Sequence, residues 1–269
     1  MATPTRIAIT GAASGLGREL ALCWARTGAR VALADINGER LAAVAQEVAA
    51  AGGTALLQKC DVRLADDLDA LVDACVQAWG GLDVFVNNAG VAGGGSFERL
   101  TDEDWQWLLD INLMGVVRGS RAATAQFRRQ GHGHIVNIAS MAGLLAPPGM
   151  SSYNVAKTGV VSLSETLYGE LQPLGIRVTC VCPSFFRTNL MESLRTPDPG
   201  MRKSFDRLLD TSDITAADVA ARVFGAVARG DFLCLPHRKG RNAWWMKRAF
   251  YARYLQEMAK IGASLARRR

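Results

Sequence analysis

Short apolar runs alternate with longer amphipathic segments along most of the chain, which is typical of β-α-β units around a parallel sheet. The apolar runs predict strands at Arg6–Thr10, Arg30–Asp35, Ala55–Cys60, Leu82–Asn87, His134–Ala139, Arg177–Cys182 and Asp231–Leu235. The segments with helical spacing predict helices at Gly15–Thr27, Gly38–Ala51, Leu64–Trp79, Asp102–Arg129, Ser152–Leu171 and Thr215–Arg229. Because β-α-β crossovers are right-handed, we expect a doubly wound α/β fold with helices on both faces of a seven-stranded parallel sheet.

The last 33 residues follow a different pattern. In the segment Ala243–Leu265, apolar residues recur at helical spacing while Arg253, Glu257 and Lys260 lie on another face, which predicts an amphipathic helix. We therefore expect one dehydrogenase-sized α/β domain over residues 1–236 and a helical tail over residues 237–269. Residues 185–214 show little pattern, and we expect them to form a long functional loop or lid.

Composition fits a globular protein, with 49% hydrophobic and 21% charged residues. The net charge of +6 is unevenly distributed, because residues 237–269 hold ten Lys or Arg and one Glu. Residues 1–236 then carry a net charge of −3, so we expect no nucleic-acid partner. For the tail, we favour packing on its own domain or on a second subunit. A membrane surface or an acidic partner stays open because of Trp244, Trp245 and the terminal Arg267–Arg269.

Nothing in the sequence has the length of a membrane-spanning helix, and the N-terminus lacks the pattern of a signal peptide, so we expect a cytoplasmic protein. The six cysteines are scattered without metal-ligand spacing, and we expect no metal site. We expect no disulfide between Cys180 and Cys182.

A glycine-rich turn follows the first predicted strand. It reads Thr10-Gly-Ala-Ala-Ser-Gly-Leu-Gly17 and leads into a helix, so Gly11, Ser14, Gly15, Leu16 and Gly17 can bring backbone N–H groups close to a pyrophosphate. Its G-x3-G-x-G spacing differs from the general G-x-G-x-x-G fingerprint, and alone it is weak evidence.

Asp35 closes the second strand 18 residues after Gly17. A carboxylate at this place accepts hydrogen bonds from the ribose hydroxyls of an adenosine and repels a 2′-phosphate. Since Ser14, Ile36 and Asn37 supply no cation, we expect NAD rather than NADP.

The helix after the fifth strand carries Tyr153 and Lys157, which are four residues apart and share a face. A nearby cation favours the phenolate, so the pair suits proton transfer near neutral pH. Ser140, at the end of the fifth strand, could hold a substrate oxygen beside them. A Tyr-x3-Lys pair by itself is common on surface helices. The evidence for a catalytic role is the position of this pair after the fifth predicted strand, with Ser140 thirteen residues before Tyr153.

Together, the glycine turn, Asn87-Asn-Ala-Gly90, Ser140 and Tyr153-x3-Lys157, in this order and spacing, resemble the classical short-chain dehydrogenase/reductase family over residues 5–236. The resemblance implies a Rossmann-type domain in which Tyr153 is the general acid/base. It also implies that Lys157 binds the nicotinamide ribose and lowers the tyrosine pKa, and that Ser140 positions the reacting oxygen.

Further roles rest on the resemblance alone. Asn112 would hold a water in a proton relay, and the remaining cofactor contacts would come from Asp61, Val62, Asn88, Ala89, Gly90, Pro183 and Thr188. Where the family usually has Pro-Gly, this chain has Pro183-Ser184, which leaves the path of that loop open.

The predicted function is thus an oxidoreductase that transfers hydride between NAD(H) and a hydrophobic secondary alcohol or ketone. Apolar residues after Ser140 and at Phe185, Phe186, Leu190 and Met191 support this substrate class. The alternative is a non-catalytic NAD-binding regulatory protein, or a membrane-associated protein that uses its basic tail. We expect a homodimer or homotetramer.

Overall fold

Seven parallel strands form the centre of the computed structural model, which describes residues 4–210 and 212–266. The strands are β1 (Arg6–Thr10), β2 (Arg30–Asp35), β3 (Thr54–Lys59), β4 (Val84–Asn87), β5 (Gly133–Ile138), β6 (Ile176–Val181) and β7 (Leu233–Cys234). Their order is β3-β2-β1-β4-β5-β6-β7. Strands β1 to β3 are added toward one edge of the sheet and β4 to β7 toward the other, so the strand order reverses between β1 and β4. The predicted Rossmann-type sheet is confirmed.

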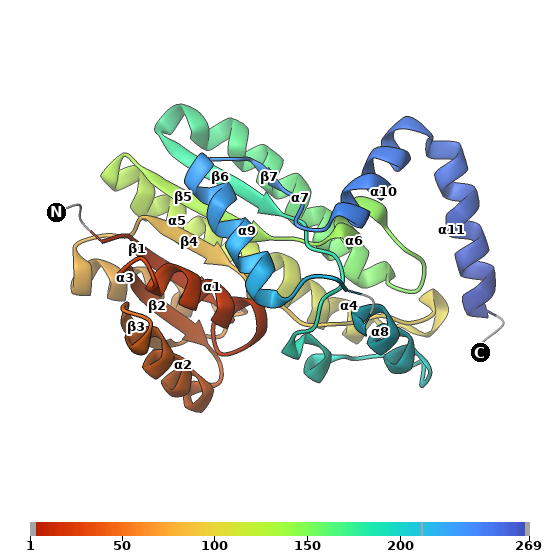
Figure 1. The fold of residues 1–269 in the computed structure, drawn as a ribbon, viewed down its shortest axis with the longest axis horizontal. Coiled ribbons are helices and arrows are strands. Elements are labelled where there is room, and N and C mark those ends of the chain that lie inside the picture. The colour runs from red at the N-terminus through yellow and green to blue at the C-terminus, as the bar shows by residue number, and fades with distance from the viewer. Residues whose placement is uncertain (1–3, 211, 267–269) are drawn as a thin grey trace.

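Helices cover both faces of this sheet (Figure 1). One face packs on α1 (Gly15–Ala25), α2 (Gly38–Ala50) and α9 (Ala216–Arg229), and the other packs on α3 (Ala65–Trp79), α5 (Gly115–Gln130) and the end of α7 (Ser151–Leu171). Alternate residues of a strand enter opposite cores. In β1, Ile7 and Ile9 face the first helix layer, while Ala8 faces the second.

The helix predicted over Asp102–Arg129 contains one irregular turn. It consists of α4 (Asp102–Leu109), a π-helical turn η2 (Asp110–Met114) and α5, with Thr101 and Asp104 forming a capping box at the start. An extra residue in a π turn changes which side chains face the sheet. Asn112, buried in this turn, is consequently aimed at the loop after β4.

The lid, which is described over residues 185–210 and 212–214, contains a short helix η4 (Asn189–Ser193) and α8 (Met201–Asp210). The lid is held at several points. The buried Asp198 carboxylate accepts hydrogen bonds from Ser96 N (2.7 Å) and Arg99 Nη1 (2.8 Å), and the Arg195 guanidinium lies 4.0 Å from the ring centroid of Trp107. These contacts join the lid to the loop after β4.

The tail is two helices rather than the single helix predicted over Ala243–Leu265. α10 (Arg238–Ala249) and α11 (Tyr251–Ala266) meet at Phe250, where the backbone leaves the helical region, and form a hairpin at one end of the molecule (Figure 1). The bend allows both helices to contact the body. Lys247 Nζ donates to Leu144 O (2.6 Å), and the buried Tyr254 donates its hydroxyl to Leu145 O. The predicted cluster at Arg267–Arg269 lies outside the described residues.

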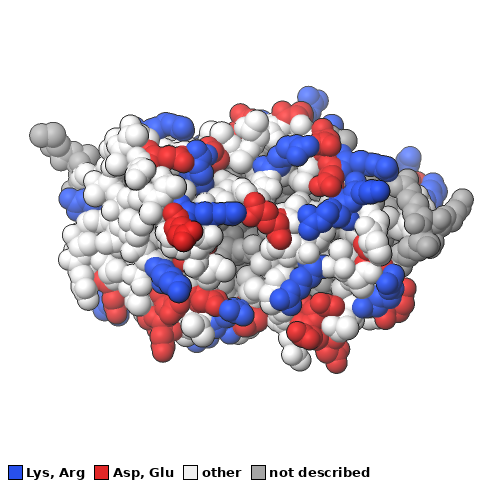
Figure 2. Space-filling view, turned by 90° about the horizontal axis from the view of Figure 1, so that it is seen from below, with Lys and Arg blue, Asp and Glu red and all other residues white. Residues whose placement is uncertain are grey.

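Acidic and basic side chains are interspersed over the face shown in Figure 2. Among the described helices, none is long and apolar enough to cross a membrane. The Sγ atoms of Cys180 and Cys182 lie 3.9 Å from each other in the core, and both cysteines are free. Residues two positions apart in an extended strand lie on the same face, so the continuation of β6 places the two side chains together.

His134 is buried in β5, with Nε2 2.8 Å from Thr179 Oγ1, while the Thr179 hydroxyl donates to Asp231 O (2.7 Å). Burial lowers the pKa of His134 from 6.5 to about 4. Between pH 6.5 and about pH 4, the His134 imidazole is protonated in the unfolded chain but neutral in the folded protein. Acidification in this window therefore favours unfolding. We expect the free energy of unfolding to fall by roughly 3 kcal/mol through this group as pH falls from 6.5 to 4.

Denaturant titrations at several pH values would measure this dependence. The His134→Gln variant, which does not titrate, should show a shallower loss of stability than the wild type in that window. His132→Gln changes an exposed neighbour and should keep the wild-type slope. Equal slopes for the wild type and His134→Gln would contradict the prediction.

Candidate active site

The turn between β1 and α1 requires glycine at specific positions. Gly11 and Gly15 have φ angles of 65° and 53°, in the left-handed region that glycine favours. Gly17 has no room for a side chain, because a Cβ there would lie 2.1 Å from Gly11 O. The turn ends at the N-terminus of α1, where free backbone N–H groups and the helix dipole favour an anion.

The loop after β4 supports this turn directly. The amide group of Asn88 donates to Thr10 O (2.9 Å) and to Gly11 O (3.1 Å). In return, Thr10 Oγ1 accepts the backbone N–H groups of Asn88 (3.0 Å) and Ala89 (3.1 Å). Asn88 and Ala89 thus hold the glycine turn in shape, which is a role that the sequence did not reveal.

Asp35 lies at the carboxyl end of β2 beside the glycine turn. Its Oδ2 accepts a hydrogen bond from Ala13 N (3.1 Å), and its Oδ1 accepts one from Asn37 N (3.0 Å). These bonds fix the carboxylate at the cavity described below. Arg40, which the sequence reasoning missed, lines the same cavity one turn into α2, and its guanidinium pairs with Glu192 of the lid (2.9 Å).

Tyr153 and Lys157 share a face of α7 and are both buried. Lys157 Nζ lies 5.7 Å from the centroid of the Tyr153 ring and donates to Ile138 O (2.9 Å). Ser140 forms the N-cap of α6 (Met141–Leu145), with its Oγ accepting from Ala142 N (3.1 Å) and hydrogen-bonding the Tyr153 side chain. The three predicted catalytic side chains therefore meet.

Burial has the largest effect on the pKa values of Tyr153 and Lys157. It raises the pKa of Tyr153 to about 12, against the smaller lowering by Ser140, and it lowers the pKa of Lys157 to about 8. The lowering of the tyrosine pKa expected from Lys157 is not found: desolvation is the largest cause of the shift, and Ser140 is the side chain that opposes it. At neutral pH, Tyr153 is a neutral phenol that can donate a proton.

Asn112 acts on the loop after β4 through its side chain. Its Oδ1 accepts from Val91 N (2.8 Å) and its Nδ2 donates to Val91 O (2.9 Å). A Cβ added at Gly90 would lie 3.1 Å from Asn112 Oδ1 and 3.8 Å from Lys157 Nζ. Asn112, Gly90 and Lys157 are thus close neighbours. The hydrogen bonds of the Asn112 side chain go to the backbone of Val91, so Asn112 positions the loop after β4.

A cavity of about 510 Å³ joins these elements. Most of the predicted site residues line it: Gly11, Ser14, Gly15, Leu16, Asp35, Asn88, Ala89, Gly90, Ser140, Tyr153, Lys157, Pro183 and Thr188. At the catalytic end, its wall is largely apolar and includes Leu145, Pro147, Met150, Phe185 and Phe205.

Four predicted residues do not line this cavity. Gly17 and Asn112 lie behind its wall and shape the two loops, as described above. The Asp61 carboxylate forms an ion pair with Arg63 (2.5 Å), which lowers the pKa of Asp61, and Val62 packs against Gly115. The structure therefore gives Asp61 and Val62 local contacts at the end of β3, and their expected adenine contacts stay a prediction.

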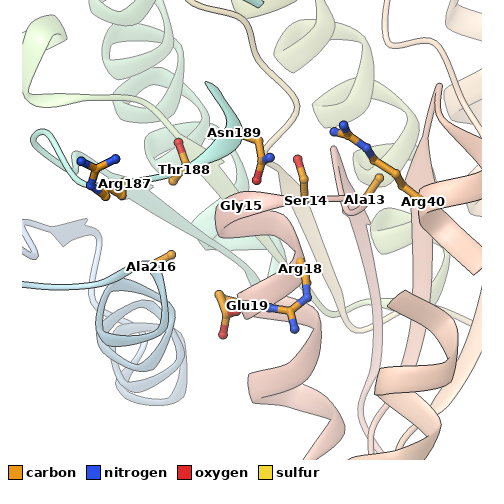
Figure 3. A pocket seen from close by; sticks show the side chains of 10 residues that line it. All are labelled: Ala13, Ser14, Gly15, Arg18, Glu19, Arg40, Arg187, Thr188, Asn189 and Ala216. Atoms are coloured by element: carbon orange, nitrogen blue, oxygen red, sulfur yellow. Dashed lines mark hydrogen bonds and ion pairs between the residues drawn. The ribbon is translucent and has the colours of Figure 1, made fainter. Parts of the chain in front are cut away.

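The lid passes over the outer mouth of the site, where Arg187, Thr188 and Asn189 lie across from Ser14 and Gly15 (Figure 3). A Cβ added at Gly15 would be 3.2 Å from Thr188 Cβ. A second cavity of about 560 Å³ lies at this mouth.

His237 supports the inner end of the lid and was assigned no role from the sequence. Its Nδ1 accepts a hydrogen bond from Ser184 N (3.1 Å), and its ring packs on Phe186 with a centroid distance of 5.8 Å. Ser184 is thus held by a histidine at the start of the tail. The two residues are 53 positions apart in the chain, which is too far for a local sequence pattern to indicate this contact.

Residues 5–199 match the family model described as short chain dehydrogenase. A 3-oxoacyl-[acyl-carrier-protein] reductase from Synechocystis sp. is 36% identical over 69% of this chain and 76% of its own. A 3beta-hydroxysteroid dehydrogenase 2 from Eggerthella lenta is 37% identical over 73% of this chain and 76% of its own. A solved short chain dehydrogenase/reductase from Burkholderia phymatum, in complex with NAD, is 33% identical, covers 91% of this chain and 94% of its own, and superposes with a TM-score of 0.86.

Proposed function

Because the chain belongs to the short-chain dehydrogenase family, we propose that it transfers hydride between NAD(H) and a hydrophobic secondary alcohol or its ketone. The observation that carries this proposal is the meeting of Ser140, Tyr153 and Lys157 in the wall of one cavity with the glycine turn and Asp35. A non-catalytic NAD-binding protein would not need these three side chains at one end of the cavity. We expect the protein to act as a cytoplasmic homodimer or homotetramer.

The residues present fit a nicotinamide dinucleotide. The glycine turn at the N-terminus of α1 suits its pyrophosphate, and the Asp35 carboxylate suits the hydroxyls of its adenosine ribose. Lys157 Nζ, an ammonium donor at the cavity wall, suits the hydroxyls of the second ribose. When bound, the cofactor supplies the hydride acceptor or donor.

The protein residues handle the proton. The Ser140 hydroxyl can donate a hydrogen bond to the substrate oxygen and orient it toward Tyr153 Oη. In the direction of carbonyl reduction, Tyr153 donates its phenolic proton to that oxygen. In the direction of alcohol oxidation it must accept the proton as phenolate, and its raised pKa makes this form scarce at neutral pH. Oxidation should therefore accelerate as pH rises.

The apolar wall supports the substrate class. Leu145, Met150, Phe185 and Phe205 surround the catalytic end of the cavity, and apolar pockets with a few polar groups select apolar ligands. The steroid dehydrogenase among the relatives acts, by its name, on a hydrophobic secondary alcohol, whereas the acyl-carrier-protein reductase acts on a carrier-bound ketone. We propose a free apolar substrate because the α6 and lid side chains that line this end of the cavity are apolar.

Absorbance of the reduced nicotinamide tests the proposal directly. Purified protein would be mixed with NAD and a panel of secondary alcohols, and with NADH and the matching ketones, graded from short to steroid-sized, as well as with 3-oxoacyl thioesters. We expect turnover with the apolar members in both directions. Turnover confined to acyl thioesters would contradict the substrate class, and a folded protein inactive on the whole panel would contradict the activity.

The Asp35→Ser variant tests the preference for NAD. It removes the acceptor for the ribose hydroxyls and the charge that repels a 2′-phosphate, while Arg40 stays at the cavity to receive that phosphate. We expect the ratio of kcat/KM for NAD to kcat/KM for NADP to fall about 100-fold. This is two factors of ten, each of which corresponds to about 1.4 kcal/mol. Steady-state kinetics with each cofactor would measure the ratio.

Glu39→Gln is the matched control, since it removes an exposed negative charge from the start of α2 beside Arg40. Its ratio should stay within about twofold of the wild type, as a surface charge contributes little. A wild-type enzyme that prefers NADP would overturn the role given to Asp35 while leaving the proposed reaction intact.

A further inference from the structure

The hairpin of α10 and α11 buries part of its apolar surface against the body and leaves part exposed. On the inner side, Tyr254 is 3% exposed, and Leu265 lies beside Gly149 of the loop that leads to the cavity. On the outer side, five large apolar residues are exposed around the bend. This group, called the hairpin tip, comprises Trp245, Met246, Phe250, Tyr251 and Leu255.

The hairpin tip is too exposed to stabilise the fold by burial. Trp245, Phe250 and Tyr251 are 57%, 63% and 58% exposed. Three aromatic side chains in seven consecutive residues form a local apolar surface, whereas singly scattered exposed apolar residues are normal. The side of the hairpin that the body needs is already satisfied by the contacts of Lys247 and Tyr254 with α6.

Cations surround this apolar surface. Arg241 and Arg248 are four residues before and three residues after Trp245, so all three share a face of α10, and Arg253 is exposed in the first turn of α11. Over residues 238–266 there are seven basic residues and one acidic residue, Glu257, which pairs with Lys260 (2.6 Å). The local charge is therefore strongly positive.

The combination of exposed aromatic rings and arginines distinguishes between two binding partners for this surface, a second copy of the chain and a lipid bilayer. A second copy of the hairpin placed on this surface would oppose arginines with arginines, which is unfavourable. An anionic bilayer accepts aromatic rings at the level of its headgroups and attracts the arginines beside them. We propose that the hairpin tip docks on the surface of an anionic phospholipid bilayer.

The position of the hairpin connects the proposed lipid contact to the catalytic cavity. α11 runs along the loop between α6 and α7, with Gly262 beside Pro148, and neighbouring Leu145, Pro147 and Met150 line the catalytic cavity. Docking would hold this side of the cavity next to the lipid. The lipid contact itself does not depend on the proposed function, because it rests on the hairpin alone.

Flotation with lipid vesicles tests the proposal on the full chain without measuring turnover. We expect the protein to float with vesicles containing phosphatidylglycerol at low salt, to be released as salt rises, and to stay unbound with pure phosphatidylcholine. The Trp245→Ser/Phe250→Ser double variant should need about tenfold more lipid for half binding. Phe97→Ser, which removes a 71% exposed ring elsewhere, should bind as the wild type does.

A second pair tests the charges. Arg248→Gln/Arg253→Gln should also weaken binding about tenfold, whereas Arg121→Gln/Arg128→Gln removes two exposed arginines from α5 and should not. Failure to float with anionic vesicles at low salt, or equal binding of a hairpin variant and its control, would overturn the proposal. Sedimentation velocity adds one more outcome: if Trp245→Ser/Phe250→Ser splits a wild-type oligomer, the surface belongs to a second copy and the proposal is wrong.

Discussion

Replacing Tyr153 by Phe is expected to lower kcat by about 10³-fold or more while the protein stays folded. The substitution removes one oxygen from a ring that keeps its packing against Leu108, Met150 and Phe205. General acid–base catalysis contributes 10²- to 10⁴-fold, and among the residues that line the described cavity there is no second tyrosine and no histidine or cysteine to replace the phenol. Turnover of an accepted substrate, together with circular dichroism, would measure both effects.

Tyr168→Phe is the matched control. It removes the same oxygen from the same helix at a ring that is 43% exposed and packs on Phe232. Its kcat should equal that of the wild type. If Tyr153→Phe retained wild-type turnover, the mechanism proposed here would be wrong, whereas a loss of NAD binding in that variant would point to a structural role of the tyrosine.

Replacing Gly17 by Ala is expected to weaken NAD binding about 100-fold or more. The new Cβ would lie 2.1 Å from Gly11 O and 2.6 Å from Asn88 Nδ2, so the glycine turn and the amide that braces it must both move. A displacement of about 1 Å in a binding site can cost 10²-fold. Titration calorimetry with NAD and a thermal melt would separate weaker binding from a loss of stability.

The control for this experiment is Gly169→Ala, at a helical position of α7 where an added Cβ meets no atom within 4 Å. That variant should bind NAD normally and melt slightly higher, since Ala favours a helix over Gly by up to about 1 kcal/mol. Unchanged NAD affinity in Gly17→Ala would refute the tight packing of Gly17 against Gly11.

The sheet and most of the candidate site could be predicted from local signals. Strands that end at Thr10, Asp35, Asn87 and Ile138 place their following residues at one edge, since parallel strands share a direction. This is why Asp35 and Ser140 could be placed at the same cavity although 105 positions separate them in the sequence.

What could not be predicted depends on contacts between distant segments. His237 meets Ser184, and Arg40 meets Glu192, only because the lid folds back over the sheet edge. The direction of the Tyr153 pKa was also missed, because a sequence shows that Lys157 is near but does not show how completely both groups are buried. The bend at Phe250 likewise follows from contacts of α10 and α11 with α6, which a helical pattern does not contain.

The π turn at Asp110–Met114 carries a consequence for variation in chain length. Each residue of an α-helix advances the chain by about 100° around its axis, so deleting one residue from this turn would restore regular α geometry and rotate one flanking helix relative to the other. Asn112 would then lose Val91, even though every remaining residue kept its identity. At this position we expect a one-residue insertion or deletion to disturb the site more than most substitutions do, because it changes the direction of every side chain on one flanking helix.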